Sequence, residues 1–294
     1  MTSSPTPSLS LIPSASRPPG PTGSGSRTLA MAQSMGLVRS RSLQNRSCPK
    51  PSLLPRSSPV MSNGFAGFSF LIVIDFESTC WAEKGPGCFP PEIIEFPAVL
   101  LDTQTGHILD EFHSYVLPTE TPQLSEFCTQ LTGIRQDQVD TQGVPLPTCL
   151  YLFAQWMRKI QTHWNIVLHE TRLGFRSTTF VTWSDWDFLV CLNSECRRKR
   201  ITKPDMFNAW VDLRFIYTKF YARKPKGLQG ALQDVGPQFE GREHSGLCDA
   251  RNTAKLAWHL IQDGCPIGLT KVLGGTRVSD ALRYQHVTSK PPNQ

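Results

Sequence analysis

The sequence is most apolar at Phe70-Leu71-Ile72-Val73-Ile74-Asp75-Phe76-Glu77, a short run that two acidic residues close. Such a run, rich in β-branched residues, predicts a buried β-strand. Side chains alternate along a strand, so Asp75 and Glu77 point to the same face. Two carboxylates beside an apolar core are costly unless a positive charge lies between them, and a divalent cation such as Mg²⁺ binds carboxylate oxygens. The alternative is a solvated strand end that tolerates both charges without a ligand.

The composition separates a tail from a globular domain. The chain has 294 residues, of which 39% are hydrophobic, and this suits one substantial domain. Residues 1–60 are rich in Ser and Pro and contain no acidic residue, so we expect residues 1–66 to form a disordered tail. Seven of the thirty Lys and Arg residues lie in residues 1–60, which leaves twenty-three against twenty-four acidic residues. The basic pI of about 8.9 therefore comes from the tail, and net charge is weak support for nucleic-acid binding.

The cysteines and the hydropathy of the sequence indicate in which cellular compartment we expect the protein. The nine cysteines include no Cys-x-x-Cys pair, so their spacing does not indicate a zinc site. Reduced thiols inside the cell are the default for such a chain. No apolar stretch reaches the roughly 18–20 residues that span a bilayer, and no secretory signal pattern occurs. We expect an intracellular protein, nuclear or cytoplasmic, that is neither secreted nor bound to a membrane.

The order of expected elements predicts the fold class. After the first strand, alternation and turn residues predict strands at 92–101, 108–117 and 179–183 and favour a short one at 166–168. Helical patterns occur at 124–134, 147–160, 187–200, 210–221, 228–235 and 248–263. This order predicts an α/β domain with a mixed five-stranded sheet flanked by helices, covering residues 67–270, with a C-terminal tail at 271–294. Asp187 follows a strand and Asp249 starts the last helix, where open α/β sheets place their chemistry.

A third acidic motif completes the set. His244 precedes Asp249 on the loop that leads into the last expected helix. Either residue alone would be explained as a structural hydrogen-bonding group or as a helix N-cap. Together with Asp75, Glu77 and Asp187, however, the two residues form a recognisable pattern.

This pattern resembles the DEDDh class of 3′→5′ exonucleases, the DnaQ-like group with a ribonuclease H-like fold. The motifs that carry the resemblance are Val73-Ile74-Asp75-Phe76-Glu77-Ser78-Thr79, Trp186-Asp187, and His244-x4-Asp249. The Eri subgroup of 3′ exonucleases is similar over further stretches, at residues 75–81, 92–97, 131–134 and 241–247. Asp185 competes with Asp187 as the third carboxylate, and Asp187 is preferred because family members place this residue directly after an aromatic.

The resemblance implies a metal-dependent 3′→5′ exonuclease that releases 5′-mononucleotides, with RNA as the expected substrate. It implies two Mg²⁺ ions, replaceable by Mn²⁺, held by Asp75, Glu77, Asp187 and Asp249, with His244 as general base. It sets the terminal nucleotide against Glu77, Ser78 and His244. Candidates for packing the terminal base and sugar are Phe76, Trp81 and residues 131–134. Phe76 is equally well explained as a core residue, because it faces away from the carboxylates.

Two other functions remain open. The chain could be a catalytically weak nucleic-acid-binding or adaptor module on the same fold, although all five catalytic residue types are intact. It could also be an exonuclease that acts on DNA, since recognition of the 2′-hydroxyl depends on geometry that the sequence does not give. The basic clusters at 197–200 and 223–226 either track a phosphate backbone or form solvated helix faces.

Overall fold

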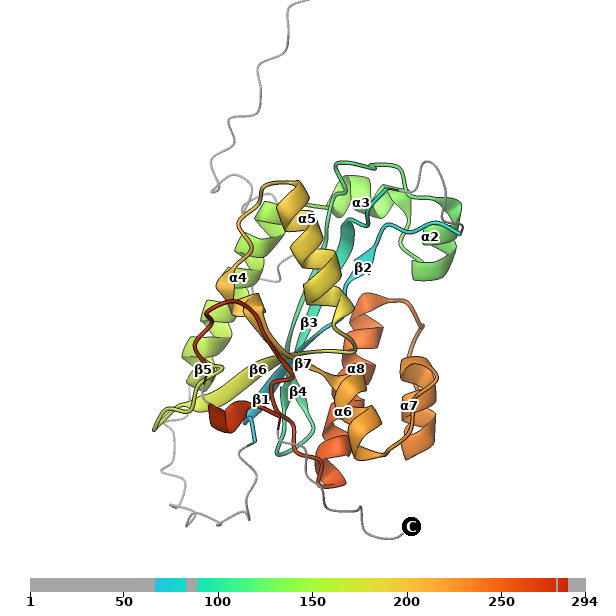
Figure 1. The fold of residues 1–294 in the computed structure, drawn as a ribbon. Helices are drawn as coiled ribbons and strands as arrows, with labels where there is room; N and C mark the ends of the chain where they lie inside the picture. The colour runs from blue at the N-terminus through green and yellow to red at the C-terminus, as the bar shows by residue number, and fades with distance from the viewer. Residues whose placement is uncertain (1–66, 83–88, 279, 285–294) are drawn as a thin grey trace, which may run out of the picture.

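A computed structural model describes residues 67–82, 89–278 and 280–284, which form an α/β fold built on one sheet (Figure 1). The predicted tail at 1–66 lies outside the described residues. The strands are β1 (Phe70–Ile74), β2 (Glu77–Ser78), β3 (Ile93–Asp102), β4 (Ile108–Tyr115), β5 (Ile166–Leu168), β6 (Arg176–Thr182), β7 (Ala209–Asp212) and β8 (Lys271–Val272). The α-helices are α2 (Glu126–Thr132), α3 (Gln136–Gln142), α4 (Leu146–Trp164), α5 (Asn193–Arg198), α6 (Leu213–Phe220), α7 (Gly227–Val235) and α8 (Gly246–Gln262). A π-helix, η1 (Trp186–Leu192), and two 3-10 helices, η2 (Asp205–Asn208) and η3 (Asp280–Leu282), complete the set.

The sheet is mixed, as predicted. Its order is β2-β3-β1-β6-β7-β8, with β4 paired to β3 and β5 paired to β6. Strand β1 runs antiparallel to β3 and parallel to β6. The sheet has eight strands and not five, because the periodicity does not reveal β2, β7 and β8, which are only two to four residues long.

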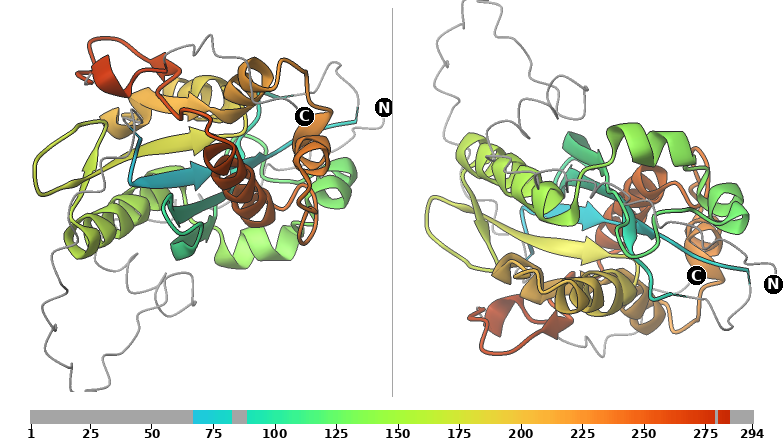
Figure 2. Two further views of the ribbon diagram at one scale, coloured as in Figure 1. Left: turned by 90° about the horizontal axis from the view of Figure 1, so that it is seen from below. Right: turned by 90° about the horizontal axis from the view of Figure 1, so that it is seen from above.

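Alternation along β1 divides the core between the two faces of the sheet. Phe70, Ile72 and Ile74 pack with α4, η1 and α5 on one face. Leu71 and Val73 pack with α6, α7 and α8 on the other face. The two layers of helices on either side of the sheet are visible in Figure 2. A smaller cluster joins α2 and α3 to β3 beyond the end of β1.

The topology sets the edge of the sheet at which chemistry can occur. Because β1 and β6 are parallel neighbours, their carboxyl ends meet at the same edge. The segments that follow them are residues 75–77 and η1, and the first turn of α8 packs against this edge because α8 contacts both β1 and β3. All three acidic motifs are therefore brought to one place.

Two predicted helices differ from the structure. The segment 187–200 begins as a π-helix and becomes α-helical only at Asn193, so its backbone is wider in the turn that contains Asp187. The segment 210–221 begins as strand β7, which pairs with β6, and the helix starts only after Asp212. The Asp212 side chain accepts a hydrogen bond from the backbone N–H of Phe215 (2.7 Å) and so caps α6, which explains the late start.

The folded unit also continues beyond residue 270. Strand β8 pairs with β7, and Leu282 is buried. Backbone hydrogen bonds join Leu269 to Leu282 and to Tyr284. Residues 271–278 and 280–284 therefore continue the fold past position 270, where the sequence predicts that the domain ends. In the described ranges, none of the helices has the length and apolar character required to cross a membrane.

Candidate active site

Four carboxylates converge at the edge where β1 and β6 end. Asp75 and Glu77 follow β1 on the face that α8 covers, and Asp249 comes from the first turn of α8. Asp187 comes from the first turn of η1, and its Oδ1 accepts a hydrogen bond from the backbone N–H of Phe76 (2.9 Å). Glu77, Asp187 and Asp249 are 4–8% exposed. The structure thus brings together the four acidic residues that the sequence singles out.

The electrostatics of the cluster are unfavourable without a cation. Burial, and then the neighbouring charge of Asp187, raises the pKa of Asp75 well above its usual value. Burial, and then the charge of Glu95, raises the pKa of Glu77 to about 9. Burial also raises the pKa values of Asp187 and Asp249 to about 7. Among the ion pairs of the described residues, none supplies a Lys or Arg to these four carboxylates. A set of buried, uncompensated carboxylate oxygens is a donor set suited to hard divalent cations.

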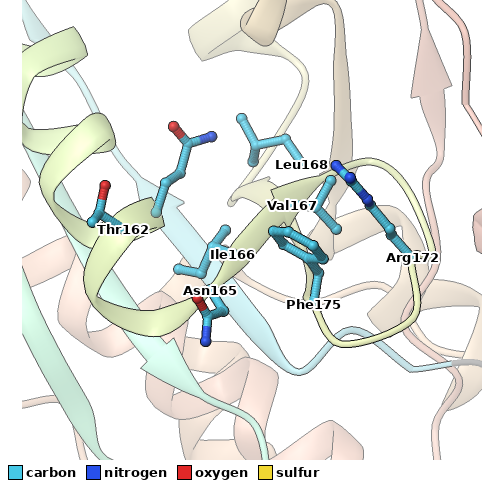
Figure 3. A pocket seen from close by; sticks show the side chains of 8 residues that line it. Thr162, Asn165, Ile166, Val167, Leu168, Arg172 and Phe175 are labelled. Carbon is cyan, nitrogen blue, oxygen red and sulfur yellow. The ribbon is translucent and has the colours of Figure 1, made fainter.

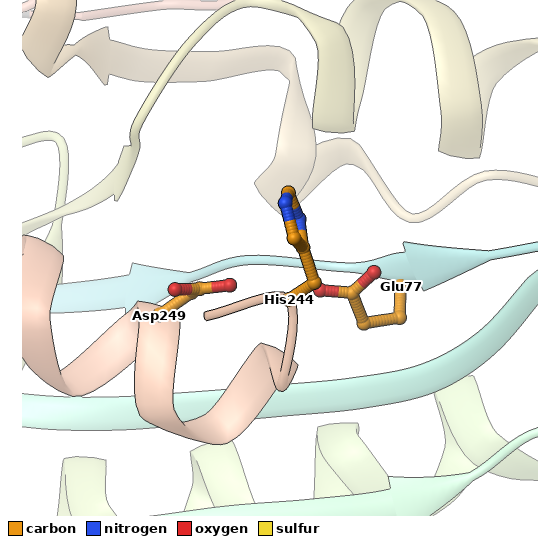
Figure 4. Close-up of side chains that lie close together, drawn as sticks. All are labelled: Glu77, His244 and Asp249. Atoms are coloured by element: carbon orange, nitrogen blue, oxygen red, sulfur yellow. The ribbon is translucent and has the colours of Figure 1, made fainter. Parts of the chain in front are cut away.

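His244 lies beside this cluster on the loop before α8. Its side chain is exposed, and one of its ring nitrogens lies within 4.8 Å of carboxylate oxygens of Glu77 and Asp249 (Figure 4). The backbone at His244 is left-handed, with φ of 59°, a conformation that costs a non-glycine residue about 1–2 kcal/mol. A backbone hydrogen bond from His244 partly offsets the effect of burial on the pKa of Asp249.

The competing candidate, Asp185, has a different task. Its Oδ2 forms an ion pair with Nζ of Lys271 (2.9 Å), and its Oδ1 accepts a hydrogen bond from Nε1 of Trp210 (3.0 Å). Asp185 therefore joins η1 to strands β7 and β8, whereas Asp187 accepts its hydrogen bond from Phe76, the residue after Asp75. Of the two aspartates, Asp187 therefore lies with the other acidic residues of the cluster, and Asp185 lies in a structural network.

The proposed base-packing residues separate into two groups. Phe76 is 3% exposed and packs edge-on against Phe96, with ring centroids 4.5 Å apart. It packs in the core on the face opposite the carboxylates, which favours the core interpretation over a contact with substrate. Ser78 is buried beside Glu77 in β2, and Trp81 is partly exposed. No described contact assigns Trp81 a role.

Two further residues lie at the site and are missing from the predicted set. Glu95, opposite Glu77 in the β2–β3 pair, is buried, and its Oε2 accepts a hydrogen bond from the backbone N–H of Gly246 (2.9 Å). Arg242 donates hydrogen bonds to the backbone carbonyls of Gln130 (2.5 Å) and Leu131 (3.3 Å), and so joins the His244 loop to the end of α2. Both residues lie inside stretches that resemble the Eri subgroup, but a lone Glu or Arg carries no chemical pattern by itself.

Three side chains of the two basic clusters bind other parts of the fold. Nζ of Lys199 lies between the buried carboxylates of Glu92 (2.5 Å) and Glu195 (2.6 Å). Arg198 pairs with Glu120 (3.0 Å), and Arg223 donates to the hydroxyl of Tyr217 (3.1 Å). For these three side chains, the contacts favour neither a path for a phosphate backbone nor a solvated helix face. Their charges instead bind other residues within the domain.

A hollow of about 440 Å³ lies elsewhere, between the end of α4 and β5 (Figure 3). It is beside the start of β6, whereas the carboxylates follow the end of that strand. Its lining residues include no carboxylate; they are Gln161, Thr162, Asn165, Ile166, Val167, Leu168, Arg172 and Phe175. This hollow is therefore unsuited to the chemistry that the acidic motifs indicate.

Comparison with known proteins decides the family. Residues 72–257 match the family described as Exonuclease, a span that includes all four carboxylates and His244. The chain belongs to the exonuclease family. The ERI1 exoribonuclease 2 of Mus musculus is 51% identical over 251 residues, which are 84% of this chain and 35% of that protein. The 3′-5′ exonuclease Snipper of Drosophila melanogaster is 45% identical over 209 residues, which are 70% of this chain and 74% of that protein.

Solved structures give the same assignment. The nuclease domain of 3′hExo, a DEDDh family member bound to rAMP, is 35% identical with a TM-score of 0.63, and the match covers 71% of this chain and 100% of that domain. The predicted DEDDh class, Eri subgroup and ribonuclease H-like fold are thereby confirmed. Exonucleases of this class depend on divalent metal ions, and the four clustered carboxylates, three buried and Asp75 partly exposed, fit that requirement. The chain spans about a third of the length of the ERI1 exoribonuclease 2 proteins that it matches.

Proposed function

We propose that this chain is a metal-dependent 3′→5′ exonuclease that hydrolyses phosphodiester bonds from the 3′ end of RNA and releases 5′-mononucleotides. The observation that carries the proposal is the convergence of Asp75, Glu77, Asp187 and Asp249 beside an exposed imidazole, with no ion pair from a Lys or Arg of the described residues to these carboxylates. An adaptor that had kept only the fold would have no need to retain such an electrostatically costly cluster.

The proposed ligands are two Mg²⁺ ions, which Mn²⁺ can replace. Asp75 is the candidate for contact with both ions, because it follows β1 between the other acidic motifs and the charges of Asp187, Asp249 and Glu77 raise its pKa. Glu77 and Asp249 would complete one site, and Asp187 would support the other. When bound, two divalent ions neutralise these carboxylates and stabilise charge on the attacking and leaving oxygens of the phosphodiester.

His244 is the proposed general base. A ring nitrogen within 4.8 Å of Glu77 and Asp249 is close enough to take a proton from a water held between them, directly or after a small side-chain rotation. Its exposure leaves the ring free to pass that proton to solvent after each turnover. Because hard cations prefer oxygen, we assign His244 to proton transfer and the carboxylates to metal binding.

The terminal nucleotide would lie against Glu77 and Ser78, with residues 131–134 beside it. This placement is supported by Arg242, which holds the end of α2 next to the His244 loop. Trp186, which precedes Asp187 and is 38% exposed, is a further candidate for contact with a base.

RNA is favoured by the relatives. Four of the similar proteins are named ERI1 exoribonuclease 2, and one solved relative is described as recognising the 3′ end of a histone mRNA stem-loop. The proposal includes a nuclear or cytoplasmic location, in keeping with the seven free cysteines among the described residues.

The experiment uses matched single-stranded RNA and DNA oligonucleotides labelled at the 5′ end, with a free or a blocked 3′-hydroxyl. In Mg²⁺ we expect a ladder shortened from the 3′ end, mononucleotides with a 5′-phosphate, and faster degradation of RNA than of DNA. A blocked 3′ end should stop degradation. Faster degradation of DNA would transfer the proposal to DNA, and binding without any shortening in Mg²⁺ or Mn²⁺ would support the adaptor alternative.

A further inference from the structure

Glu95 is a fifth carboxylate beside the four that face the proposed metal ions. It is 3% exposed and lies directly opposite Glu77 in the antiparallel β2–β3 pair, so both side chains point to the face that α8 covers. Its charge acts on Glu77, Asp75 and Asp249 in the direction that disfavours their ionisation. A fifth negative charge in this cluster is unfavourable, so the contacts of Glu95 should show which interactions compensate for it.

The two oxygens of Glu95 have separate partners. Oε2 accepts a hydrogen bond from the backbone N–H of Gly246 (2.9 Å), and Oε1 lies 2.7 Å from Nε2 of His113 on β4. The imidazole of His113 and the carboxyl group of Glu95 are thus joined by a hydrogen bond between β4 and β3. Glu95 is thus held between β4 and α8, which distinguishes it from the four carboxylates that the proposed cations would contact.

Gly246 is the first residue of α8, and its N–H is one of the groups that a helix leaves without an internal partner. The N-cap residue, Ser245, makes no side-chain hydrogen bond to the helix. Glu95, 151 residues away in sequence, takes over this capping role. A carboxylate at a helix N-terminus also interacts favourably with the helix dipole.

Gly246 packs closely against the backbone of Asp75 and the side chain of Glu95. A Cβ atom on Gly246 would lie 2.7 Å from the backbone oxygen of Asp75 and 3.1 Å from Oε2 of Glu95. The absence of a side chain therefore lets the first turn of α8 lie directly on the end of β1. Asp249 and His244 lie within three residues of Gly246, so a shift of this turn would move both of them relative to Asp75 and Glu77.

We propose that Glu95, oriented by His113, is a positioning residue for the reaction, which fixes the first turn of α8 so that Asp249 and His244 meet Asp75 and Glu77 in working geometry. The inference rests on the proposed function. Loss of such an outer contact typically costs about 10–100-fold in activity or metal affinity.

The test compares Glu95→Ala, Glu95→Gln and His113→Ala with a matched control, Glu111→Gln. Glu111 also joins β4 to α8, through an ion pair with Arg251 (2.6 Å), but on the solvent side of the helix. Glutamine at position 95 can still accept from Gly246 through its carbonyl oxygen and can donate its amide to Nε2 of His113 when that nitrogen is unprotonated. It therefore keeps the connection and loses only the charge.

Two readouts are measured on the full chain: single-turnover cleavage of RNA at saturating Mg²⁺, and hydrogen exchange of the backbone amides at residues 246–250. Glu95→Ala should lower the cleavage rate by about 10–100-fold and speed exchange in the first turn of α8. Glu95→Gln should recover most of both properties, His113→Ala should fall between them, and Glu111→Gln should match the wild type.

Three results would overturn the inference: Glu95→Ala that cleaves at the wild-type rate, Glu95→Gln that is as slow as Glu95→Ala, or unchanged exchange in both Glu95→Ala and His113→Ala. The exchange measurement needs no turnover. An inactive wild type would therefore contradict the proposed function, whereas unchanged exchange in the variants would contradict the positioning role itself.

Discussion

Asp249→Asn should stabilise the metal-free protein while it abolishes turnover. Burial raises the pKa of Asp249 to about 7 from the usual 3.8. A carboxyl whose pKa is higher in the folded state destabilises the fold as pH rises from its unfolded value through its folded value. With about 1.4 kcal/mol for each pKa unit, the cost approaches roughly 4 kcal/mol at pH 8 and is about 2 kcal/mol at pH 5. The neutral amide removes that cost and keeps an oxygen to accept the hydrogen bond from His244.

The assay is urea unfolding in the presence of a chelator at pH 5 and pH 8, with tryptophan fluorescence as the signal that monitors unfolding. We expect Asp249→Asn to exceed the wild type in the free energy of unfolding by a margin that is larger at pH 8 than at pH 5. The control is Asp140→Asn, an exposed carboxylate on α3, whose effect should stay within about 0.5 kcal/mol at both pH values. The reasoning is refuted if Asp249→Asn gains no stability at pH 8, or gains more at pH 5.

Three other predictions concern catalysis and binding. Asp187→Asn should remove most single-turnover activity in Mg²⁺. Asp185→Asn should mainly lower thermal stability, because it weakens the contacts with Lys271 and Trp210. If Asp185→Asn were the less active variant, the roles of the two residues would be exchanged. His244→Ala should slow cleavage by about 10²–10⁴-fold, the usual cost of losing a general base, while a calorimetric titration with Mn²⁺ shows metal affinity largely kept; a large loss of affinity would make His244 a ligand. Residues 1–60 carry seven positive charges and no acidic residue, so their deletion should weaken RNA binding at low salt and make the affinity less dependent on salt. Turnover at saturating RNA should change little. A large loss of turnover at saturating RNA would mean that the tail contributes to catalysis.

The sequence predicts the site better than it predicts the segments around it. Asp75 and Glu77 could be found because a long apolar run makes any buried charge conspicuous, and Asp249 because a strong helical pattern begins beside it. Phe76 was ambiguous for a physical reason: strand alternation places it opposite the carboxylates, and the structure buries it against Phe96. Only the family resemblance suggested a substrate contact for it.

The elements that the sequence missed are short or depend on distant partners. The sequence predicts a helix where β7 lies, because its four residues precede a helical pattern without a break, but its pairing with β6 decides its conformation. Lys199 looked like part of a basic surface because the acids that bind it, Glu92 and Glu195, come from different elements. The role of Glu95 at the start of α8 spans 151 residues and leaves no local pattern.

The most direct test of the central claim is a Mg²⁺ titration of single-turnover cleavage, with wild type and Asp75→Asn side by side on one RNA with a free 3′-hydroxyl. The charges of the three other carboxylates raise the pKa of Asp75, so a neutral Asn at this position should remove a proposed metal ligand. We predict saturable, Mg²⁺-dependent release of 5′-mononucleotides by the wild type, and no detectable release by a folded Asp75→Asn at any Mg²⁺ concentration. Near-normal cleavage by Asp75→Asn, or cleavage by the wild type that persists in a chelator, would contradict the account.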